Sequence, residues 1–238
     1  LILFEGLVSI NDLNIFKKSK QSIIDKANDS ICLGLSKRGG GIVDIKYYNV
    51  NNFCINIFVD VVDAMGAAIS IKIAEELKQE FETILQKKAL MCSPSNISPQ
   101  RLAYSSFQIN LSKDGISLET AKKIVLANKI TEYDLLRASS HNKGIMNGVI
   151  AVAIACGQDT RAIEASCHTW TIFKYGKYQS LTNYEVDVNK NILKGFIELP
   201  IAVGTIGGAI NKNINYQNNL IFMNIRGLGF GVWGLGFG

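Results

Sequence analysis

The stretch GGGIVDIKYYNVNNFCINIFVDVVDAMGAA, residues 39–68, decides the fold of the first part of the chain. Residues 42–50 and 53–62 are rich in β-branched and aromatic side chains, which is typical of strands. An Asn-Asn pair between them favours a hairpin turn. The three glycines at residues 39–41 mark a sharp turn or a close approach of two backbones. We therefore expect two antiparallel strands here.

Helical segments flank this hairpin on both sides. Ser9 and Asp12 form a capping box that begins a helix running to about Asn28. Residues 63–88 have apolar side chains at helical spacing, which predicts one buried face. The members of this face are Ile73, Ala74, Leu77, Phe81, Ile84 and Leu85. Because residues 102–111 return to a strand, the order helix, strand, strand, helix, strand predicts a small α+β sandwich.

The chain beyond residue 114 is mainly helical by the same criteria. Helices are predicted at residues 117–128, 131–139 and 159–174. The last begins at Asp159, where the helix dipole favours a carboxylate. A second hairpin is predicted from residues 178–188 and 192–199.

Glycine dominates the end of the chain. Residues 199–208 predict a glycine-rich loop, and residues 220–225 a strand before a repetitive Gly-Phe-Trp tail. The tail contains a spacing like G-x-G-x-x-G. Since no helix follows it in this chain, we do not interpret it as a dinucleotide fingerprint.

Composition excludes several classes of function. The net charge of +5 comes from scattered lysines, which argues against nucleic-acid binding. Five cysteines without C-x-x-C spacing and only two histidines argue against a metal site and favour a reducing compartment. The best apolar run, residues 149–156, is too short to span a membrane. We expect a cytoplasmic protein that binds neither nucleic acid nor membrane and holds no metal.

The sequence Asp63-Ala-Met-Gly66 joins a strand to a helix. It is a candidate anion site, because helix N-termini bind phosphates and glycine allows close approach. The alternative is structural: Asp63 caps the helix and Gly66 relieves crowding. From this motif alone, the structural interpretation is favoured.

Arg137, Lys143 and Asp159 bracket a long run of small apolar residues. The planar guanidinium of Arg137 suits a carboxylate ligand. Lys143 is able to stabilise a developing oxyanion, or to form a Schiff base as in an aldolase, or it is a solvated cation. A lysine at a helix start opposes the dipole, and such a conflict is expected at a functional site. We expect His168 to be packed and hydrogen-bonded rather than catalytic, whereas His141 is ambiguous.

Taken together, these motifs resemble hydroxymethylglutaryl-CoA (HMG-CoA) reductases of the bacterial class II branch. The resemblance covers roughly residues 22–212 and is specific as a group of motifs in order. The matching segments are Asp63–Ala67, Asn96-Ile97, Arg101–Ala103, Arg137–His168, Ser180–Thr182 with Glu185, and Glu198–Gly208.

The resemblance implies an α+β fold in which a small NAD(P)-binding sandwich is inserted into a larger, mainly helical substrate domain. Residues 1–105 would form the first, residues 106–215 an incomplete part of the second, and residues 216–238 an atypical Gly-rich tail. The implied oxidoreductase reaction belongs to the mevalonate pathway of isoprenoid biosynthesis. It interconverts HMG-CoA and mevalonate plus CoA by two hydride transfers with NADPH or NADH.

The same resemblance implies roles for particular residues. Lys143 would stabilise the oxyanion, and Asp159 would hold and tune that lysine. Arg137 would grip the HMG carboxylate and Asn147 matches a site asparagine. The residues that match the cofactor motif are Asp63, Met65 and Gly66. Separately from the resemblance, Lys37 and Arg38 beside the three glycines would suit the 2′-phosphate of NADP, but surface solvation is the favoured explanation, so the choice between NAD and NADP stays open.

The chain also departs from the family pattern. It lacks the Glu-Arg-Pro-Ser motif with the catalytic glutamate and the C-terminal segment with the catalytic histidine, and Ala68 replaces an asparagine. Each missing proton donor is worth roughly 10² to 10⁴ in rate. We therefore expect this chain alone to be an incomplete or near-inactive reductase. The alternative is a truncated relic that retains only nucleotide or CoA binding or oligomerisation.

Helix geometry adds one expectation. If residues 144–158 form one straight helix, Lys143 and Asp159 lie roughly 20–25 Å apart. Either the helix breaks near Gly148 and folds back, or the two groups meet across a dimer interface. Because the resemblance implies sites shared between subunits, we favour a homodimer or a higher oligomer.

Overall fold

The chain folds into two compact units, Leu1–Ser95 and Asn96–Gly238, which are considered separately. The computed structural model describes residues 1–206, 210 and 213–225, with backbone only for 220–225. The sequence-based boundary at residue 105 needs correction, because it falls inside strand β5 (Leu102–Asn110). This strand pairs along its whole length with β7 (Ile192–Pro200) and so belongs entirely to the second unit.

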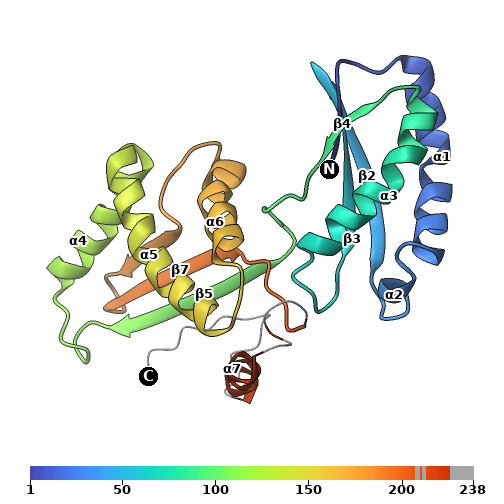
Figure 1. The fold of residues 1–238 in the computed structure, drawn as a ribbon. Coiled ribbons are helices and arrows are strands. Elements are labelled where there is room, and N and C mark those ends of the chain that lie inside the picture. Colours follow the sequence, from blue (N-terminus) through green and yellow to red (C-terminus); the bar gives the residue numbers. More distant parts are fainter. Residues whose placement is uncertain (207–209, 211–212, 226–238) are drawn as a thin grey trace. The chain divides into compact units, whose positions relative to one another are not determined.

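A four-stranded antiparallel sheet forms the base of the first unit (Figure 1). Its strands are β1 (Ile2–Phe4), β2 (Gly41–Val50), β3 (Asn52–Asp60) and β4 (Ala89–Cys92), in the order β2-β3-β1-β4. The predicted hairpin is confirmed: β2 and β3 are joined at Asn51, whose φ of 62° is a left-handed conformation that asparagine tolerates. Strands β1 and β4 were not predicted.

Helices α1 (Ile10–Asp29) and α3 (Ala67–Leu85) pack on this sheet, with a four-residue helix α2 (Leu33–Ser36) between α1 and β2. The predicted cap of α1 is confirmed, since Ser9 Oγ accepts a hydrogen bond from the Asp12 amide at 3.1 Å. The order β1-α1-β2-β3-α3-β4 is the ferredoxin-like split βαβ arrangement. The prediction of a small α+β sandwich is therefore confirmed.

Aromatic side chains fill the centre of this sandwich. The Phe16 ring lies 5.7 Å from Phe81 and 6.2 Å from Phe53, and all three are at most 1% exposed. Burying a phenylalanine side chain stabilises a fold by roughly 1.5–3 kcal/mol. This helix-to-sheet contact is the reason that α1, α3 and the hairpin fold as one unit.

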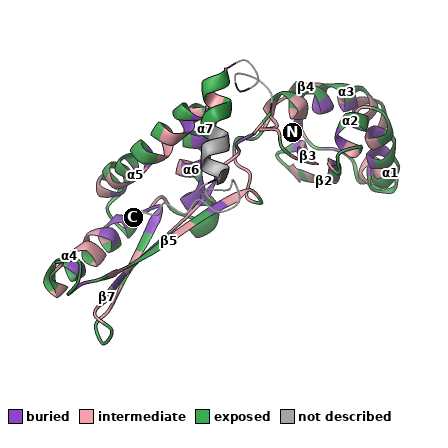
Figure 2. Ribbon diagram, turned by 90° about the horizontal axis from the view of Figure 1, so that it is seen from below, coloured by how far each residue is buried: buried purple, intermediate pink, exposed green. Residues whose placement is uncertain are grey.

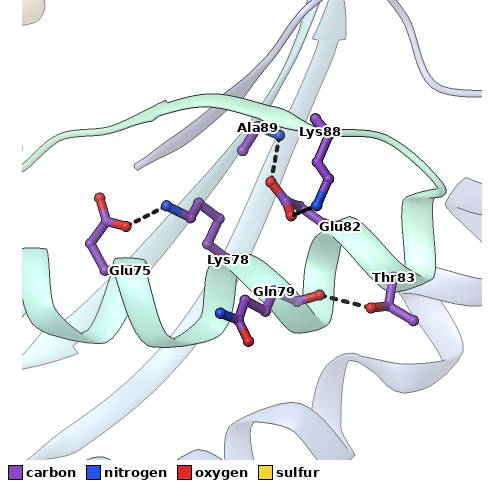
Figure 3. Close-up of polar contacts among 7 residues, drawn as sticks. All are labelled: Glu75, Lys78, Gln79, Glu82, Thr83, Lys88 and Ala89. Atoms are coloured by element: carbon purple, nitrogen blue, oxygen red, sulfur yellow. Dashed lines mark hydrogen bonds and ion pairs between the residues drawn. The ribbon is translucent and has the colours of Figure 1, made fainter.

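Charged residues on α3 tie that helix to β4 (Figure 3). Glu82 accepts a hydrogen bond from the Ala89 amide at 2.9 Å and one from Lys88 at 2.7 Å. Lys88, and next the Ala89 amide, lower the pKa of Glu82. One turn earlier, Lys78 bonds Glu75 at 2.6 Å. Glu82 thus fixes the connection through which α3 leads into the edge strand β4.

The second unit is a three-stranded antiparallel sheet with helices. The sheet order is β5-β7-β6, with β6 spanning Thr182–Asp187, and the predicted β6-β7 hairpin is confirmed. The helices are α4 (Leu118–Lys129), a 3-10 turn (Ile130–Glu132), α5 (Leu135–Ala155), α6 (Thr160–Tyr175) and α7 (Ile214–Ile225). Buried residues of α5 and α6 form a core with the sheet (Figure 2), and the members with the largest side chains are Met146, Ile163, Trp170, Leu181 and Leu199.

Two predictions in this unit are wrong. The helix expected at residues 131–139 is not separate, because Asp134 caps one helix that runs on to Ala155. The strand expected at residues 220–225 is part of α7, and short apolar runs fit either structure. The Gly-rich tail therefore begins later than residue 216, and residues 226–238 lie outside the described residues. Within the described part of the chain, no helix is long and apolar enough to cross a membrane.

Candidate functional site

Helix α5 carries three of the candidate residues, Arg137, Lys143 and Asn147, and is unbroken from Leu135 to Ala155. The Asp134 carboxylate begins it by accepting a hydrogen bond from the Arg137 amide at 3.0 Å. The helix continues through Gly144 and Gly148, and a Cβ at either glycine would meet nothing within 4 Å. The folding-back alternative is therefore wrong.

Lys143 and Asn147 lie one turn apart on the exposed face of α5. Leu136 and Ile154 on the same face are 81% and 58% exposed. Lys143 makes no hydrogen bond or ion pair with any residue that the structure describes. A Schiff-base lysine is activated by desolvation in an apolar pocket, so this exposure argues against an aldolase.

Asp159 begins α6 as its N-cap. Its Oδ1 atom accepts hydrogen bonds from the amides of Arg161, at 3.1 Å, and Ala162, at 3.2 Å. The Arg161 side chain also lies 3.7 Å from Oδ1, and the second carboxylate oxygen has no partner among the described residues. Asp159 is exposed and does not contact Lys143. Lys143 lies about 18 Å along the axis from the end of α5, which explains their separation.

Arg137 points in a different direction from Lys143. At 3.6 residues per turn, the six-residue spacing places the two side chains roughly 120° apart around the axis. Arg137 Nη2 lies 3.4 Å from His141 Nδ1, and His141 Nε2 lies 2.9 Å from Thr182 Oγ1, at the start of β6. The structure thus places Lys143 and Asn147 together and directs Arg137 toward the start of β6.

Two functional candidates on α5 were missed or left open by the sequence. Asn142 is completely buried; its Nδ2 donates to the Gln179 carbonyl at 2.8 Å and its Oδ1 accepts from the Leu181 amide at 2.9 Å. Burial, and next the Arg137 charge, lower the pKa of His141. The sequence contains only a weak indication of these two residues, namely that an amide and an imidazole side chain lie close to Lys143 in an otherwise apolar segment.

His168 lies on α6, where its Nδ1 is 2.6 Å from the Tyr178 hydroxyl and its ring stacks on the tyrosine at 5.8 Å. The prediction that His168 is packed and hydrogen-bonded is confirmed.

The segment Asp63-Ala-Met-Gly66 forms the connection from β3 to α3 in the first unit. Gly66 has a φ of 107°, and a Cβ there would lie 3.0 Å from both Val61 methyl groups, so the position requires glycine. Asp63 is exposed, and α3 has no side-chain cap and no acidic residue in its first turn. The structural alternative is therefore wrong in naming Asp63 as the N-cap, whereas its other part, that Gly66 relieves crowding, is confirmed. An uncapped helix N-terminus favours an anion.

The turn at residues 37–41 lies beside this connection. A Cβ at Gly40 would meet the Asp60 carbonyl and a Val62 methyl, each at 2.6 Å. Lys37 and Arg38 are exposed in the same turn, and Arg38 Nε donates to the Gly34 carbonyl at 3.1 Å. Two cations thus lie in a turn that packs on the segment leading to Asp63.

Neither cavity described in the second unit is lined by Lys143 or Asn147, the exposed residues of α5. An apolar hollow of about 50 Å³ between α5, α6 and the sheet is too small for a cofactor. A groove of about 910 Å³ lies between α4 and the sheet. Lys143, Asn147 and Asp159 line neither space. Among the described residues, no group of three His, Cys, Asp or Glu could hold a metal ion.

Comparison with known proteins identifies the family. The sequence pattern of hydroxymethylglutaryl-coenzyme A reductase matches residues 2–229. The chain belongs to this family. It is 38% identical over 202 residues to the 3-hydroxy-3-methylglutaryl-coenzyme A reductase of Archaeoglobus fulgidus, covering 82% of this chain and 45% of that one. It is 36% identical to the probable reductase of Borreliella burgdorferi, covering 83% and 47%.

Solved reductase structures are similar over most of this chain. A class II HMG-CoA reductase from Streptococcus pneumoniae, bound to NADPH in open conformations, matches with a TM-score of 0.84 at 32% identity. That match covers 92% of this chain and 54% of the other. A second S. pneumoniae reductase structure matches with a TM-score of 0.83 and 31% identity, covering 92% and 60%. The resemblance to bacterial class II reductases and the α+β fold class are confirmed, and the chain spans about half the length of its relatives.

Proposed function

We propose that this chain is part of an HMG-CoA reductase that interconverts HMG-CoA and mevalonate plus CoA. The observation that carries the proposal is Lys143, a lysine in the HNKGIMNG sequence of α5 that has no partner in the part of the chain that the structure describes, in a chain of the reductase family. A positioned ammonium group stabilises the negative charge that develops on a thioester carbonyl oxygen when hydride adds. Asn147, one turn away, would hydrogen-bond the same substrate.

Arg137 would bind the free carboxylate of the HMG group. Its guanidinium is able to form two parallel hydrogen bonds with a carboxylate, and a hydrogen bond to His141 leaves four of the five N–H groups available. Arg137 and Lys143 would then contact opposite ends of the small acyl group, which fixes its orientation for the reaction.

The cofactor would bind the first unit at the N-terminus of α3. NADPH or NADH supplies the hydride when bound. The uncapped first turn suits a phosphate group, and Asp63 and Met65 precede that turn. A relative with 32% identity is described as bound to NADPH, which supports this proposal. Lys37 and Arg38 would favour NADPH over NADH.

Lys143 and Asp159 would meet between two copies of the chain. Within one chain they are far apart, yet each is able to form further bonds: among the described residues, Lys143 has no partner and one carboxylate oxygen of Asp159 has none either. Exposed Leu136 and Ile154 flank the small residues of the same α5 face, as expected of an interface between subunits. We therefore propose a homodimer. The five free cysteines favour a reducing compartment and so support a location in the cytoplasm.

Substrate binding to the 238-residue chain tests the proposal. We expect calorimetry to detect binding of HMG-CoA and NADPH, and Lys143→Met to weaken HMG-CoA binding severalfold. Lys123→Met on α4 is the matched control, because Lys123 is also an exposed helical lysine. Equal affinities for the two variants would contradict the role of Lys143. Covalent trapping of a carbonyl substrate on Lys143 by borohydride would favour an aldolase instead.

A second candidate is a relic that binds nucleotide or CoA but does not react. The separation of Lys143 from Asp159 within one chain is the observation that favours it. Turnover separates the two: we expect a rate at least about 10² below that of a complete reductase, from the loss of proton transfer alone. Ligand binding with no measurable turnover would support the relic, and mevalonate-dependent NADP reduction at a normal rate would exclude it.

A further inference from the structure

A chain of hydrogen-bonding groups runs from a buried cluster to Arg137. Asn128, Ser180 and Thr182 are each at most 7% exposed. Ser180 Oγ lies 2.8 Å from Asn128 Oδ1, and Thr182 Oγ1 lies 3.3 Å from the same oxygen. Thr182 Oγ1 is also 2.9 Å from His141 Nε2, whose Nδ1 lies 3.4 Å from Arg137 Nη2.

The donor and acceptor roles of the groups fix the direction of the hydrogen bonds along this path. A guanidinium only donates, so His141 Nδ1 must accept and therefore carries no proton. The proton of a neutral imidazole is then on Nε2, which donates to Thr182 Oγ1. The threonine hydroxyl in turn donates to Asn128 Oδ1, an atom that only accepts. Each group along the path thus donates or accepts a hydrogen bond in the way that its chemistry allows.

The surroundings of His141 favour the neutral ring. Burial is the larger cause that lowers its pKa, and the charge of Arg137 is the second. Thr182, Ser180 and Asn128, which approach from β6, its preceding loop and α4, are uncharged. Among the described residues, Arg137 is the charged group that acts on the pKa of His141. A protonated imidazole would instead direct an N–H group at the guanidinium.

We propose that His141 is a positioning residue: its neutral, Nε2-protonated ring, held by Thr182, orients the Arg137 guanidinium toward a carboxylate ligand. That the ligand of Arg137 is a carboxylate rests on the proposed function, whereas the position of the proton on the His141 ring does not. An orienting partner matters because a long arginine side chain otherwise loses rotamer freedom when it binds a ligand. A ring that holds the guanidinium beforehand removes part of that cost.

The ring state is testable without a ligand. The chain contains only two histidines, so long-range ¹H–¹⁵N spectra of the imidazole rings resolve both, and His168 serves as an internal reference. We expect proton occupancy on Nε2 of His141 at neutral pH. Arg137→Lys should shift the His141 Nδ1 resonance and leave His168 unchanged. A His141 ring that carries its proton on Nδ1, or that is doubly protonated at pH 7.5, overturns the proposal.

The positioning role is tested with 3-hydroxy-3-methylglutarate, a small dicarboxylate, as the probe in calorimetry. Thr182→Val removes the acceptor for Nε2–H, and His141→Leu removes the ring. We expect each to weaken binding about tenfold, the equivalent of one modest hydrogen bond. Thr182→Ser keeps the hydroxyl and should restore affinity. The double variant should bind no worse than His141→Leu, because both changes act through one path.

Failure of this inference and failure of the proposed function give different results. If Arg137→Ala abolishes dicarboxylate binding but His141→Leu and Thr182→Val leave it unchanged, the positioning role is overturned and the proposed function stands. If the chain with Arg137 intact binds no dicarboxylate, the substrate assignment fails. In that case the imidazole spectra still decide whether His141 accepts from Arg137.

Discussion

Asn142 and Lys143 are neighbours on α5 but lie in opposite environments. Asn142 is completely buried and hydrogen-bonds the backbone of Gln179 and Leu181, whereas Lys143 is exposed and unpaired among the described residues. The amide therefore fixes the helix against the segment that enters β6, and by doing so fixes the direction in which the lysine points. The role proposed for Lys143 requires such a fixed support.

Removing that support should destabilise the second unit. Asn142→Ala leaves the Leu181 amide and the Gln179 carbonyl without their partner, at about 1–3 kcal/mol for each buried group. We expect a loss of about 3 kcal/mol in the free energy of unfolding, measured with urea. Asn147→Ala, an exposed asparagine on the same helix, is the control and should change stability by less than about 0.5 kcal/mol. Equal losses would show that the buried amide has no special role.

A side chain at Gly66 should disturb the start of α3. Gly66→Ala places a Cβ 3.0 Å from two Val61 methyl groups at a φ of 107°. We expect a loss of about 1–3 kcal/mol in the free energy of unfolding, together with weaker NADPH binding. Gly34→Ala is the control, because its Cβ would meet nothing within 4 Å and its φ is not positive. A stable Gly66→Ala variant with full NADPH affinity would exclude the α3 N-terminus as the phosphate site.

Acid should destabilise the chain through His141. Its folded-state pKa lies below the unfolded value, so between the two values the unfolded chain binds more protons. The contribution of His141 to stability is therefore fully present above the unfolded pKa of about 6.5 and decreases as the pH falls toward the folded pKa. We expect the melting temperature to fall from pH 7.5 to pH 5.5, and His141→Leu to reduce that slope. An unchanged slope in the variant would assign the acid sensitivity to other groups.

Cys167 should resist alkylation while the chain is folded. Burial is the main cause that raises the pKa of its thiol to about 12, and the side chain is 0% exposed. Because the thiolate is the reactive form, iodoacetamide at pH 8 should modify Cys167 only after unfolding. Cys54 and Cys92, which are partly exposed, provide the comparison in the same digest. Modification of Cys167 as fast as Cys54 in the native chain would contradict its burial.

Local patterns predicted the fold well where they are long. The hairpin at residues 41–60 and the cap at Ser9 follow from alternation and capping chemistry within a few residues. Strands β1 and β4 contain three and four residues, too few to show an alternation. The two glycines of α5 weakened the helical pattern, although Asp134 caps one continuous helix there.

The candidate site was only partly predictable for a different reason. Its motif residues, such as Lys143 and Asp159, are recognisable because the neighbouring sequence is distinctive. The groups that hold α5 in place and contact Arg137 are not, because their partners are distant along the chain: His141 and Thr182 are 41 residues apart in sequence, and Asn142 and Leu181 are 39 apart. Only the packing of α5 against the start of β6 places these groups together.

The proposed meeting of Lys143 and Asp159 between subunits can be tested directly. A carbodiimide joins an ammonium group to a carboxylate only when the two are in contact. Within one chain, Lys143 lies about 18 Å from the end of α5, and Asp159 follows beyond that end. We therefore expect the Lys143–Asp159 linked peptide only in the covalent dimer, and as mixed-isotope pairs when ¹⁴N-labelled and ¹⁵N-labelled chains are combined before the reaction.

Lys143→Met and Asp159→Asn should each remove that linked peptide, because each lacks one reacting group. Lys123→Met, which changes a lysine paired with Glu119 on α4, should leave it intact. A linked peptide found in the monomer would mean that α5 breaks and folds back in solution. Covalent dimers without this peptide would mean that the subunits associate through another face, and the lysine would then lack the carboxylate that the proposed reaction assigns to it.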